Sequence, residues 1–535
     1  MSQTPGAGFG PRPRFNFLYM HRFAFALAVF SAAALPAAFA AAAPAPVHRV
    51  VVLTWDGMRP DFISEANTPN LWKLREEGVS FSRHHPVFLS STEVNGTALA
   101  TGSYPAHSGV IANNEFRPAV DPLKPVEIQK IETIRKGDEV AGGRYLQART
   151  VAEILQSHGQ PTVIAGTKDV VYLLDRAVRE AGPGVSPVLA AGVTLPGSAA
   201  APIIAGLGEF PAAGTDDNKL ARDTWTTQAL VRYLWRDGLP AYTHLWLAEP
   251  DALQHSYGPG TPLALAGIRN SDRNLGLVLA ELDRRGLRAT TDVLVVSDHG
   301  FSTISRKVDL AVELSKLKFD MKRATPTPLL KGEVLAVGNG GSTLLYVGEH
   351  DPEVSAKLVT TLQAQDWTGV IFARNPFDGT FPLSEVHVDS AAAPDFVVSL
   401  RWSDSGPVGA PGSQISDLGE TSPKKGNHAS LSPYDMHNTL VAAGPDFRKG
   451  ITDPLPSSNM DVAPTILWIL GYKDEIAYMD GRVLSEALTG EAPPLRSLNM
   501  QRLTAQRGLW HQYLEVSEVN GVRYLEEGNG GISDR

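Results

Sequence analysis

Acidic residues are paired with histidines at two places where the chain is expected to leave a strand. Asp251 and His255 are four residues apart in "EPDALQHSYGPG", and on a helix this spacing puts both side chains on one face. Asp298 and His299 are adjacent in "VVSDHGF", where a turn at Gly300 would let both face the same crevice. Carboxylate oxygens and imidazole nitrogens are ligands that Zn²⁺ accepts in proteins. Both pairs therefore indicate a metal site.

Two further candidate ligands come from distant parts of the sequence. Asp56 follows the expected strand in "HRVVVLTWDG", and His428 lies among turn residues in "KGNHASLSP". Each residue also has an ordinary explanation, since an aspartate can cap a helix and a histidine can lie on the surface. The joint pattern favours a metal site, because Asp56, Asp251 and Asp298 follow three separate strands and would meet at one edge of a sheet.

A hydroxyl-rich stretch, "SSTEVNGTALATG" (Ser90 to Gly102), has the composition of a helix start. Serine and threonine cap helices, because their side-chain oxygens accept hydrogen bonds from free N–H groups of the first turn. A hydroxyl at a helix N-terminus could instead be a nucleophile that attacks an anionic substrate, which the helix end stabilises. The stretch by itself leaves both interpretations open.

The elements that must position these residues alternate between helices and strands. After the strand that precedes Asp56, the expected helix and strand pairs are 147–159 with 161–166, 225–238 with 243–251, and 267–286 with 291–300. This alternation predicts an α/β fold with a doubly wound, mostly parallel central sheet flanked by helices. In such sheets, ligands bind outside the carboxyl ends of the strands, where the acidic residues are expected.

The alternation breaks in the middle of the chain. We expect residues 44–301 and 426–490 to form the two parts of the catalytic core, and residues 302–425 to form a smaller inserted α+β lobe. Residues 491–535 are expected to form a C-terminal helix and a hairpin, with "VNGV" as the hairpin turn.

Composition narrows the classes of partner. The chain has 535 residues and a formal net charge of −9, which gives no electrostatic reason to expect nucleic acid as a bulk partner. It has no cysteine, so any metal must be held by His, Asp, Glu or hydroxyl groups.

The N-terminal segment has the pattern of an export signal. A basic flank follows Met20, an apolar run comes next, and Ala38, Phe39 and Ala40 match a cleavage pattern of small residues. We expect residues 1–43 to be a signal peptide with an upstream extension, and the mature protein to be periplasmic or secreted without stable membrane insertion. The alternative is an uncleaved membrane anchor, although Pro36 and the many alanines favour cleavage.

Taken together, the motifs resemble a known family. The order "DGMR", "TPNLWKLREEGV", "ATGSYPAHSGVIAN", "EPDALQHSYGP", "SDHGF" and "GNH" is similar to the type I phosphodiesterase/nucleotide pyrophosphatase group of the alkaline phosphatase superfamily. The resemblance extends from about Val50 to Leu488 and is poor in the middle lobe. It implies an alkaline-phosphatase-like fold and hydrolysis of a small-molecule phosphoester.

The resemblance also implies roles for individual residues. Thr92 stands nine residues before Thr101 and Gly102, where the family has its nucleophile, and Asn113 stands where the family has an asparagine on the transferring phosphoryl group. The family binds two Zn²⁺ ions per chain. By resemblance, one ion would be held by Asp251, His255 and His428, and the other by Asp56, Thr92, Asp298 and His299. Asn95 also matches a family position, for which a structural role is expected.

Departures from the family pattern concern the substrate. Glu93 replaces an aromatic residue that often belongs to the nucleobase-binding region, which puts nucleotide specificity in doubt. The segment "VIAGTKDVVYLLDR" resembles monoesterase and phosphonoacetate hydrolase relatives, in which one lysine and a second cation bind anionic substrate oxygens. Lys168 matches the lysine, Val170 replaces the second cation, and Lys168 could equally be a solvated surface residue.

Several functions remain open at this point. Two Zn²⁺ ions would roughly balance three aspartates and a Thr92 alkoxide, and a neutral site suits a singly charged diester or pyrophosphate linkage. A two-zinc phosphodiesterase is therefore the first expectation. The alternatives are a phosphate monoesterase or phosphonate hydrolase on the same metals, a phospho-alcohol transferase, and a binding protein with an inactive site.

Overall fold

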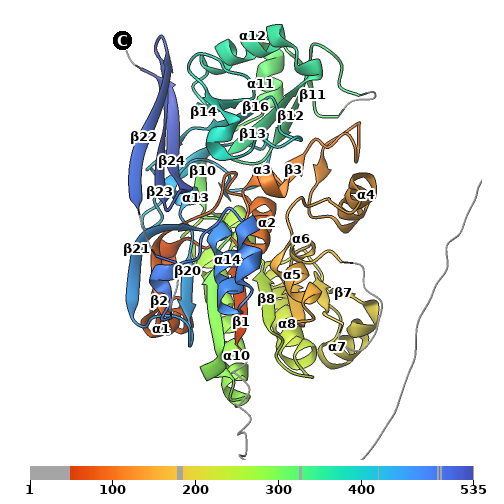
Figure 1. Ribbon diagram of the computed structural model, residues 1–535. Helices are drawn as coiled ribbons and strands as arrows, with labels where there is room; N and C mark the ends of the chain where they lie inside the picture. The colour runs from red at the N-terminus through yellow and green to blue at the C-terminus, as the bar shows by residue number, and fades with distance from the viewer. Residues whose placement is uncertain are drawn as a thin grey trace, which may run out of the picture. The chain divides into compact units, whose positions relative to one another are not determined.

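A large central sheet forms the core of the computed structural model, which describes residues 48–177, 185–324, 328–419, 421–490, 493–494 and 497–533 (Figure 1). Within these residues the sheet has nine strands in the order β21-β2-β20-β9-β1-β8-β5-β6-β7. Their bounds are β1 Arg49–Trp55, β2 Val79–His85, β5 Thr162–Gly166, β6 Val188–Ala190, β7 Val193–Leu195, β8 Tyr242–Leu247, β9 Thr291–Val296, β20 Leu440–Ala443 and β21 Ile451–Ser458.

The centre of this sheet is parallel. Strands β9, β1, β8, β5 and β6 pair in parallel, as do β2 and β21, while β20 and β7 pair antiparallel with their neighbours. Residues of β1 alternate between two apolar clusters, with Val50 and Val52 on one face and Val51 and Leu53 on the other. Strands buried on both faces need an almost continuous apolar run, which β1 has.

Helices cover both faces of the sheet. One face packs against α2 (Thr92–Thr101), α5 (Val151–Ser157), α6 (Val171–Leu174) and α14 (Asn459–Ile469). The other packs against α1 (Pro69–Glu77), α8 (Asp216–Ala229) and α10 (Pro262–Arg284). The predicted fold class, a mostly parallel sheet with helices on its two faces, is therefore confirmed.

Two smaller sheets occupy the middle of the chain. In the described part of this region, one sheet has the order β11-β12-β13-β16-β14-β15 and the other β17-β18-β10-β19. Their strands are β10 Ser302–Val308, β11 Asp320–Lys322, β12 Glu333–Gly338, β13 Ser342–Val347, β14 Thr368–Ala373, β15 Phe381–Pro382, β16 Phe396–Leu400, β17 Trp402–Ser403, β18 Ser413–Asp417 and β19 Gly426–Asn427. Helices α11 (Leu310–Lys316) and α12 (Pro352–Leu362) accompany them, so this region is a smaller α+β lobe.

The C-terminal segment differs from the prediction of a helix followed by a hairpin. Its described residues form three antiparallel strands, β22 (Leu498–Arg507), β23 (Trp510–Val519) and β24 (Val522–Ile532). The hairpin between β23 and β24 turns at Asn520 and Gly521, both with positive φ, as the Asn-Gly pair predicts. The expected helix is wrong, because β22 pairs with β23 along its whole length through a two-residue turn at 508–509, and this hairpin pairing outweighs local helix propensity.

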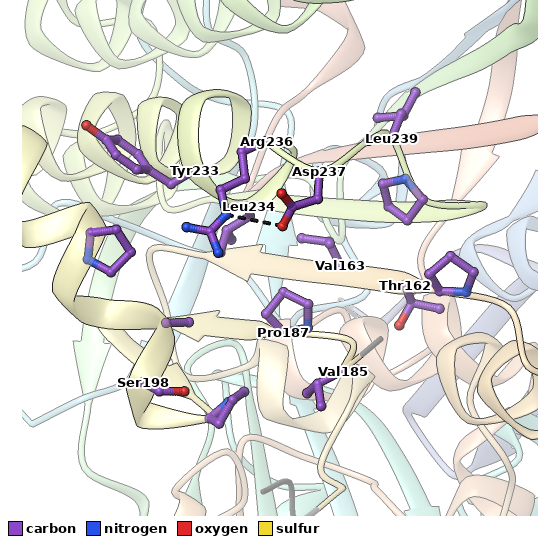
Figure 2. A pocket seen from close by; sticks show the side chains of 16 residues that line it. Thr162, Val163, Val185, Pro187, Ser198, Tyr233, Leu234, Arg236, Asp237 and Leu239 are labelled. Atoms are coloured by element: carbon purple, nitrogen blue, oxygen red, sulfur yellow. Dashed lines mark hydrogen bonds and ion pairs between the residues drawn. The ribbon is translucent and has the colours of Figure 1, made fainter. Parts of the chain in front are cut away.

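A pocket of about 580 Å³ lies at the amino ends of strands β5, β6 and β8, away from the edge that carries the acidic residues (Figure 2). Thr162, Pro187 and Leu239 line it, and its two charged side chains, Arg236 and Asp237, form an ion pair with each other. Its polar lining also includes the hydroxyls of Thr162, Ser198 and Tyr233, but its described lining residues contain no cluster of aspartates and histidines like the one at the other edge of the sheet.

The expected signal peptide, residues 1–43, lies outside the described residues. Over the part of the chain that the structure does describe, every helix is too short or too polar to cross a membrane.

A buried carboxyl group at the amino end of β9, Asp292, lies beside the partly exposed Asp446 and makes stability depend on pH. Burial and the neighbouring Asp446 raise the pKa of Asp292 to about 8. Asp446 also contacts His48, whose Nδ1 lies 2.7 Å from Asp446 Oδ2. Because the folded pKa is above the unfolded value, the protonated Asp292 stabilises the fold fully at low pH, and this stabilisation is lost as pH rises through about 8.

Asp292→Asn should therefore remove a pH-dependent loss of stability. An amide has no proton to lose, so the variant should gain on the wild type between pH 5 and pH 9, by on the order of a few kcal/mol in the free energy of unfolding. Urea unfolding at pH 5, 7 and 9 measures this difference, with Asp283→Asn on the exposed end of α10 as the matched control. A difference between Asp292→Asn and the wild type that is constant with pH would contradict the interpretation.

Candidate metal centre

Three neighbouring strands deliver aspartates to one edge of the central sheet. Strands β9, β1 and β8 are adjacent and parallel, so their carboxyl ends lie side by side. Asp56 directly follows β1, Asp298 comes two residues after β9, and Asp251 begins helix α9 (Asp251–Tyr257) after β8. This is the edge at which ligands bind in open α/β sheets.

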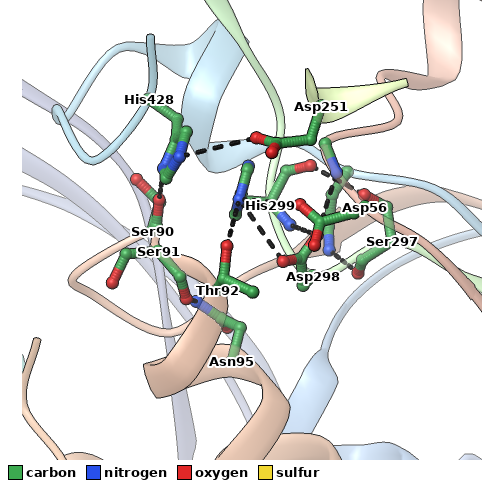
Figure 3. A network of polar contacts seen from close by, with 12 residues as sticks. Asp56, Ser90, Ser91, Thr92, Asn95, Asp251, Ser297, Asp298, His299 and His428 are labelled. Atoms are coloured by element: carbon green, nitrogen blue, oxygen red, sulfur yellow. Dashed lines mark hydrogen bonds and ion pairs between the residues drawn. The ribbon is translucent and has the colours of Figure 1, made fainter. Parts of the chain in front are cut away.

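Histidine nitrogens converge on these carboxylates in two adjacent groups (Figure 3). In the first, Asp251 Oδ1 lies 3.2 Å from His255 Nε2 and 3.7 Å from His428 Nε2. In the second, His299 Nε2 lies 3.3 Å from Asp298 Oδ2 and 3.6 Å from Asp56 Oδ1. The rings of His299 and His428 stack with centroids 3.6 Å apart, which brings the two groups together. The structure thus gathers all six Asp and His ligands that the sequence predicted.

The three histidines share one hydrogen-bonding pattern. Nδ1 faces a main-chain carbonyl in each, at Gly426 for His255, at Gly300 for His299 and at Ser90 for His428. A carbonyl only accepts, so Nδ1 carries the proton and the lone pair of Nε2 points at the carboxylates. Histidines that bind metals are commonly held in this way, because the second nitrogen fixes the tautomer and the ring orientation.

The carboxylate oxygens that face these nitrogens are the ones left without a hydrogen-bond partner. Among the described residues, Asp56 Oδ1, Asp251 Oδ1 and Asp298 Oδ2 are buried and unpartnered. The second oxygen of Asp56 accepts from Trp246 Nε1, and that of Asp298 accepts from the main chain of Gly57. Buried anionic oxygens without a donor are costly, and cations bound between them and the imidazoles would compensate. The donor set therefore fits metal ions.

Burial also sets the protonation of these groups. Burial, followed by the neighbouring Asp298, raises the pKa of Asp56 well above its usual range. Burial and the nearby His299 and His255 hold the pKa of His428 well below its usual range, so its imidazole is neutral at pH 7. A neutral imidazole is the form that binds metal, and a divalent cation would return Asp56 to its anionic form.

The hydroxyl of Thr92 faces this centre. Thr92 is the first residue of α2, it is 4% exposed, and its Oγ1 lies 3.3 Å from His299 Nε2 (Figure 3). Ser91 occupies the N-cap position, and no side-chain capping bond is made there by any described residue. The capping explanation of the hydroxyl stretch is therefore not supported, and Thr92 is placed where a nucleophile beside a metal centre would be.

Asn113 lies over the first turn of α2. Its Oδ1 accepts from the N–H of Glu93 at 3.0 Å, which leaves the Nδ2 of Asn113 as the remaining donor of the amide. Glu93 itself is 3% exposed, and its Oε2 has no hydrogen-bond partner among the described residues. Burial raises the pKa of Glu93 to about 8. The sequence singled out Glu93 only as a departure from the family, and its burial beside the centre was not foreseen.

The ammonium group of Lys168 reaches the centre, although the side chain is 24% exposed. It comes two residues after β5, the next strand beyond β8, and its Nζ donates to Asp56 Oδ2 and Asp251 Oδ2, both at 2.8 Å. Burial would lower the pKa of Lys168, but Asp251 and Asp56 outweigh burial and hold it well above its usual range. Each aspartate therefore turns one oxygen toward histidine and the other toward the ammonium group.

Supporting residues that sequence reasoning missed hold these parts in place. Asn459 Nδ2 donates to the carbonyl of Asp298 and to Asn95 Oδ1, which links the metal centre to α2. Asn95 Nδ2 donates to the carbonyls of Val87, Leu89 and Ser91, which agrees with the structural role expected of it. Neither Asn459 nor Trp246 belongs to a motif with a spacing that could have revealed it.

Comparisons with known proteins place the chain among related sequences. A profile of the family described as "Type I phosphodiesterase / nucleotide pyrophosphatase" matches residues 50–403. The rat ectonucleotide pyrophosphatase/phosphodiesterase family member 7 is 22% identical over 431 residues, which cover 80% of this chain and 84% of the relative. The bis(5'-adenosyl)-triphosphatase enpp4 of Xenopus laevis is 24% identical over 430 residues, covering 79% of this chain and 78% of the relative.

A solved structure supports the fold. Murine ectonucleotide pyrophosphatase/phosphodiesterase 5, solved as an inactive variant in complex with AMP, superposes with a TM-score of 0.55 at 18% identity. The superposition covers 79% of this chain and 95% of the murine chain.

The fold and the site define a metal-dependent hydrolase of phosphoric esters. More specifically, the chain belongs to the type I phosphodiesterase/nucleotide pyrophosphatase family. The predicted family and the predicted class of enzyme are therefore confirmed.

Removal of metal should abolish activity. A chelator-treated preparation should not hydrolyse phosphoesters, and added divalent metal should restore hydrolysis, because the buried carboxylates and imidazoles require cations. His428→Ala should lower the bound metal by about one ion per chain relative to the wild type, as measured by elemental analysis. The control is His107→Ala, whose exposed ring contacts Asp480 far along the chain. Full activity after confirmed metal loss would contradict the assignment.

Proposed function

We propose that the chain is an exported two-zinc phosphodiesterase that cleaves its substrate through a phospho-Thr92 intermediate. The observation that carries this proposal is the arrangement of three unpartnered carboxylate oxygens and the Nε2 atoms of the centre beside the Thr92 hydroxyl. The relatives named above, an ectonucleotide pyrophosphatase/phosphodiesterase and a bis(5'-adenosyl)-triphosphatase, support a small-molecule substrate with a phosphodiester or pyrophosphate linkage. The export pattern at residues 1–43 supports a periplasmic or secreted location.

Each part of the centre has a proposed role. One Zn²⁺ would be held by Asp251, His255 and His428, and the other by Asp56, Thr92, Asp298 and His299. When bound, the two ions would lower the pKa of the Thr92 hydroxyl and compensate charge on the leaving oxygen.

The reaction then proceeds in two displacements. The Thr92 oxygen attacks phosphorus, forming a Thr–O–P bond while the bond to the leaving oxygen breaks. A water molecule next attacks the same phosphorus, and the bond to Thr92 breaks, so that the hydroxyl is restored and one water is consumed. Asn113 Nδ2 and the amino end of α2 would hold the oxygens of the transferring group, since Asn113 Oδ1 is already bound to the Glu93 N–H.

A second candidate function is favoured by the position of Lys168. Two Zn²⁺ ions, three aspartates and a Thr92 alkoxide sum to zero, and Lys168 adds one positive charge within 2.8 Å of two of the aspartates. A site with an excess positive charge suits a dianionic monoester or a phosphonate better than a neutral site does. A phosphate monoesterase or phosphonate hydrolase on the same metals is therefore the alternative, and relative rates on matched substrates distinguish the two.

Thr92→Ala should remove turnover while leaving the fold and most metal binding unchanged. The loss should be at least about a thousandfold in kcat, because the attacking oxygen is gone. Thr92→Ser should retain part of the activity, since the oxygen remains. Ser91→Ala is the matched control, because Ser91 is the buried neighbour on the same helix start. If Ser91→Ala were inactive and Thr92→Ala active, the assignment of the nucleophile to Thr92 would be wrong.

Lys168→Ala should affect a dianionic substrate more than a singly charged one. If the ammonium group contacts substrate oxygens, its loss should lower kcat/KM for p-nitrophenyl phosphate by about tenfold to a hundredfold, the effect of a charge-assisted hydrogen bond of about 1–3 kcal/mol. The loss for bis-p-nitrophenyl phosphate should be smaller. Lys130→Ala is the control, because this lysine lies nearby on the surface and pairs with Asp169.

The outcomes for Lys168 separate the two candidate functions. A wild type that prefers the diester, with little change on substitution, supports the phosphodiesterase. A wild type that prefers the monoester and loses that preference supports the alternative. Equal losses on both substrates accompanied by lower metal content would mean that Lys168 serves only to orient Asp56 and Asp251.

A further inference from the structure

A second convergence of metal-ligand side chains lies between the central sheet and the C-terminal sheet, outside the candidate metal centre. His85 is the last residue of β2, Glu526 lies on β24, and His437 follows the short helix α13 (Pro433–Met436) just before β20. His85 Nε2 lies 2.9 Å from Glu526 Oε2, and His437 Nε2 lies 3.4 Å from the same oxygen. One ligand atom from each residue lies within 4.8 Å of the other two. Three segments distant in sequence thus direct their ligand atoms to one point.

The hydrogen bonds of His85 repeat those of the histidines in the candidate metal centre. His85 Nδ1 lies 3.1 Å from the main-chain carbonyl of Ser457, and this oxygen can only accept. In the neutral ring the proton therefore sits on Nδ1, and the lone pair of Nε2 points at Glu526 Oε2. A lone pair that faces a carboxylate oxygen at 2.9 Å needs a cation or a second proton between them.

The other oxygen of Glu526 is already fully used. Its Oε1 accepts from Ser517 Oγ and from Arg83 Nη2, both at 2.6 Å, which leaves Oε2 for the two imidazoles. A single proton can serve only one imidazole–carboxylate contact at a time. A divalent cation can bond to Oε2 and both Nε2 atoms together, and ligand atoms around tetrahedral zinc are separated by about 3.3 Å, close to the observed 2.9 and 3.4 Å.

Burial and access also suit a bound metal ion. His85 is fully buried and Glu526 is 7% exposed, so the anionic oxygen is shielded from water. The side chain of His437 is 36% exposed, which gives an ion a route of entry and leaves room for a water molecule as a fourth ligand.

We propose that His85, His437 and Glu526 bind a Zn²⁺ ion that is distinct from the metals of the candidate metal centre. The ion fastens the C-terminal sheet to the central sheet, because Glu526 belongs to the first and His85 to the second. It also restrains the loop beside the active site, because Asn438, next to His437, donates to the carbonyl of Ser297.

Anomalous X-ray scattering at the zinc absorption edge tests the site directly in the wild-type full chain. Crystals grown with Zn²⁺ should show a peak about 2.0–2.2 Å from Glu526 Oε2 and from both Nε2 atoms. Peaks confined to the candidate metal centre, or to surface positions, would overturn the proposal. This measurement needs no variant, so a variant that fails to fold cannot obscure it.

Metal content provides the matched test in solution. His437→Ala should bind about one Zn²⁺ fewer per chain than the wild type after dialysis against micromolar free zinc. His158→Ala, which removes an exposed imidazole that contacts Glu475, should not lower the content. Equal zinc content in His437→Ala and the wild type would overturn the proposal.

The third ion can be separated from the proposed catalytic metals. In a background that removes one ligand from each proposed catalytic ion, His255→Ala together with His299→Ala, Zn²⁺ should still raise the melting temperature, and adding His437→Ala should remove most of that increase. If the proposed function fails and no metal binds near Asp251, the dependence on His437 would remain. If the shift with Zn²⁺ is the same with and without His437, the third site is absent even where the catalytic metals bind.

Discussion

The candidate metal centre depends on positive charge that offsets the mutual repulsion of three buried aspartates. Asp56, Asp251 and Asp298 are brought together because three adjacent parallel strands end at the same edge, and each is almost inaccessible to water. Buried anions that close together are unfavourable unless they are paired. Lys168 neutralises one side of the group, and the unpartnered oxygens turn to the imidazoles on the other. The apolar packing on both faces of the sheet stabilises the strands and offsets the free-energy cost of burying these charges at their ends.

The hydroxyl of Thr92, the proposed nucleophile, is placed by the same arrangement. Helix α2 begins at Thr92 directly beside His299, and its position is set from within by Asn95, whose amide binds three carbonyls of the preceding loop. Asn459 joins Asn95 to the carbonyl of Asp298, so helix α2 and the loop that carries Asp298 and His299 are tied by one buried amide. Catalysis that relies on correct placement needs such a rigid connection, because small displacements of an attacking atom lower the rate strongly.

Charged side chains near the proposed position of the substrate phosphorus are the feature by which the protein would select its substrate. Lys168 would add a cation to a centre that the two proposed Zn²⁺ ions leave neutral, while Glu93 brings a buried carboxyl to the position after Thr92. Their electrostatic effects on a phosphoester oppose each other, since the lysine attracts an additional negative charge and an ionised glutamate repels it. The main-chain N–H of Glu93 donates to Asn113 Oδ1, so the residue that carries this carboxyl also positions the amide that would hold the phosphoryl oxygens.

The amino-acid sequence alone was enough to predict the fold class and several residues of the candidate metal centre. The alternation of helices and strands predicted the central sheet, the motif order pointed to Asp and His residues and Thr92 whose side chains the structure brings together, and the Asn-Gly pair at Asn520 predicted the hairpin turn. These features depend on local periodicity or on short motifs. Only the tertiary structure decided that Lys168 bridges two aspartates and that Trp246 binds Asp56. Those outcomes depend on which strands become neighbours, and contacts between residues far apart in sequence leave no periodic pattern within either segment.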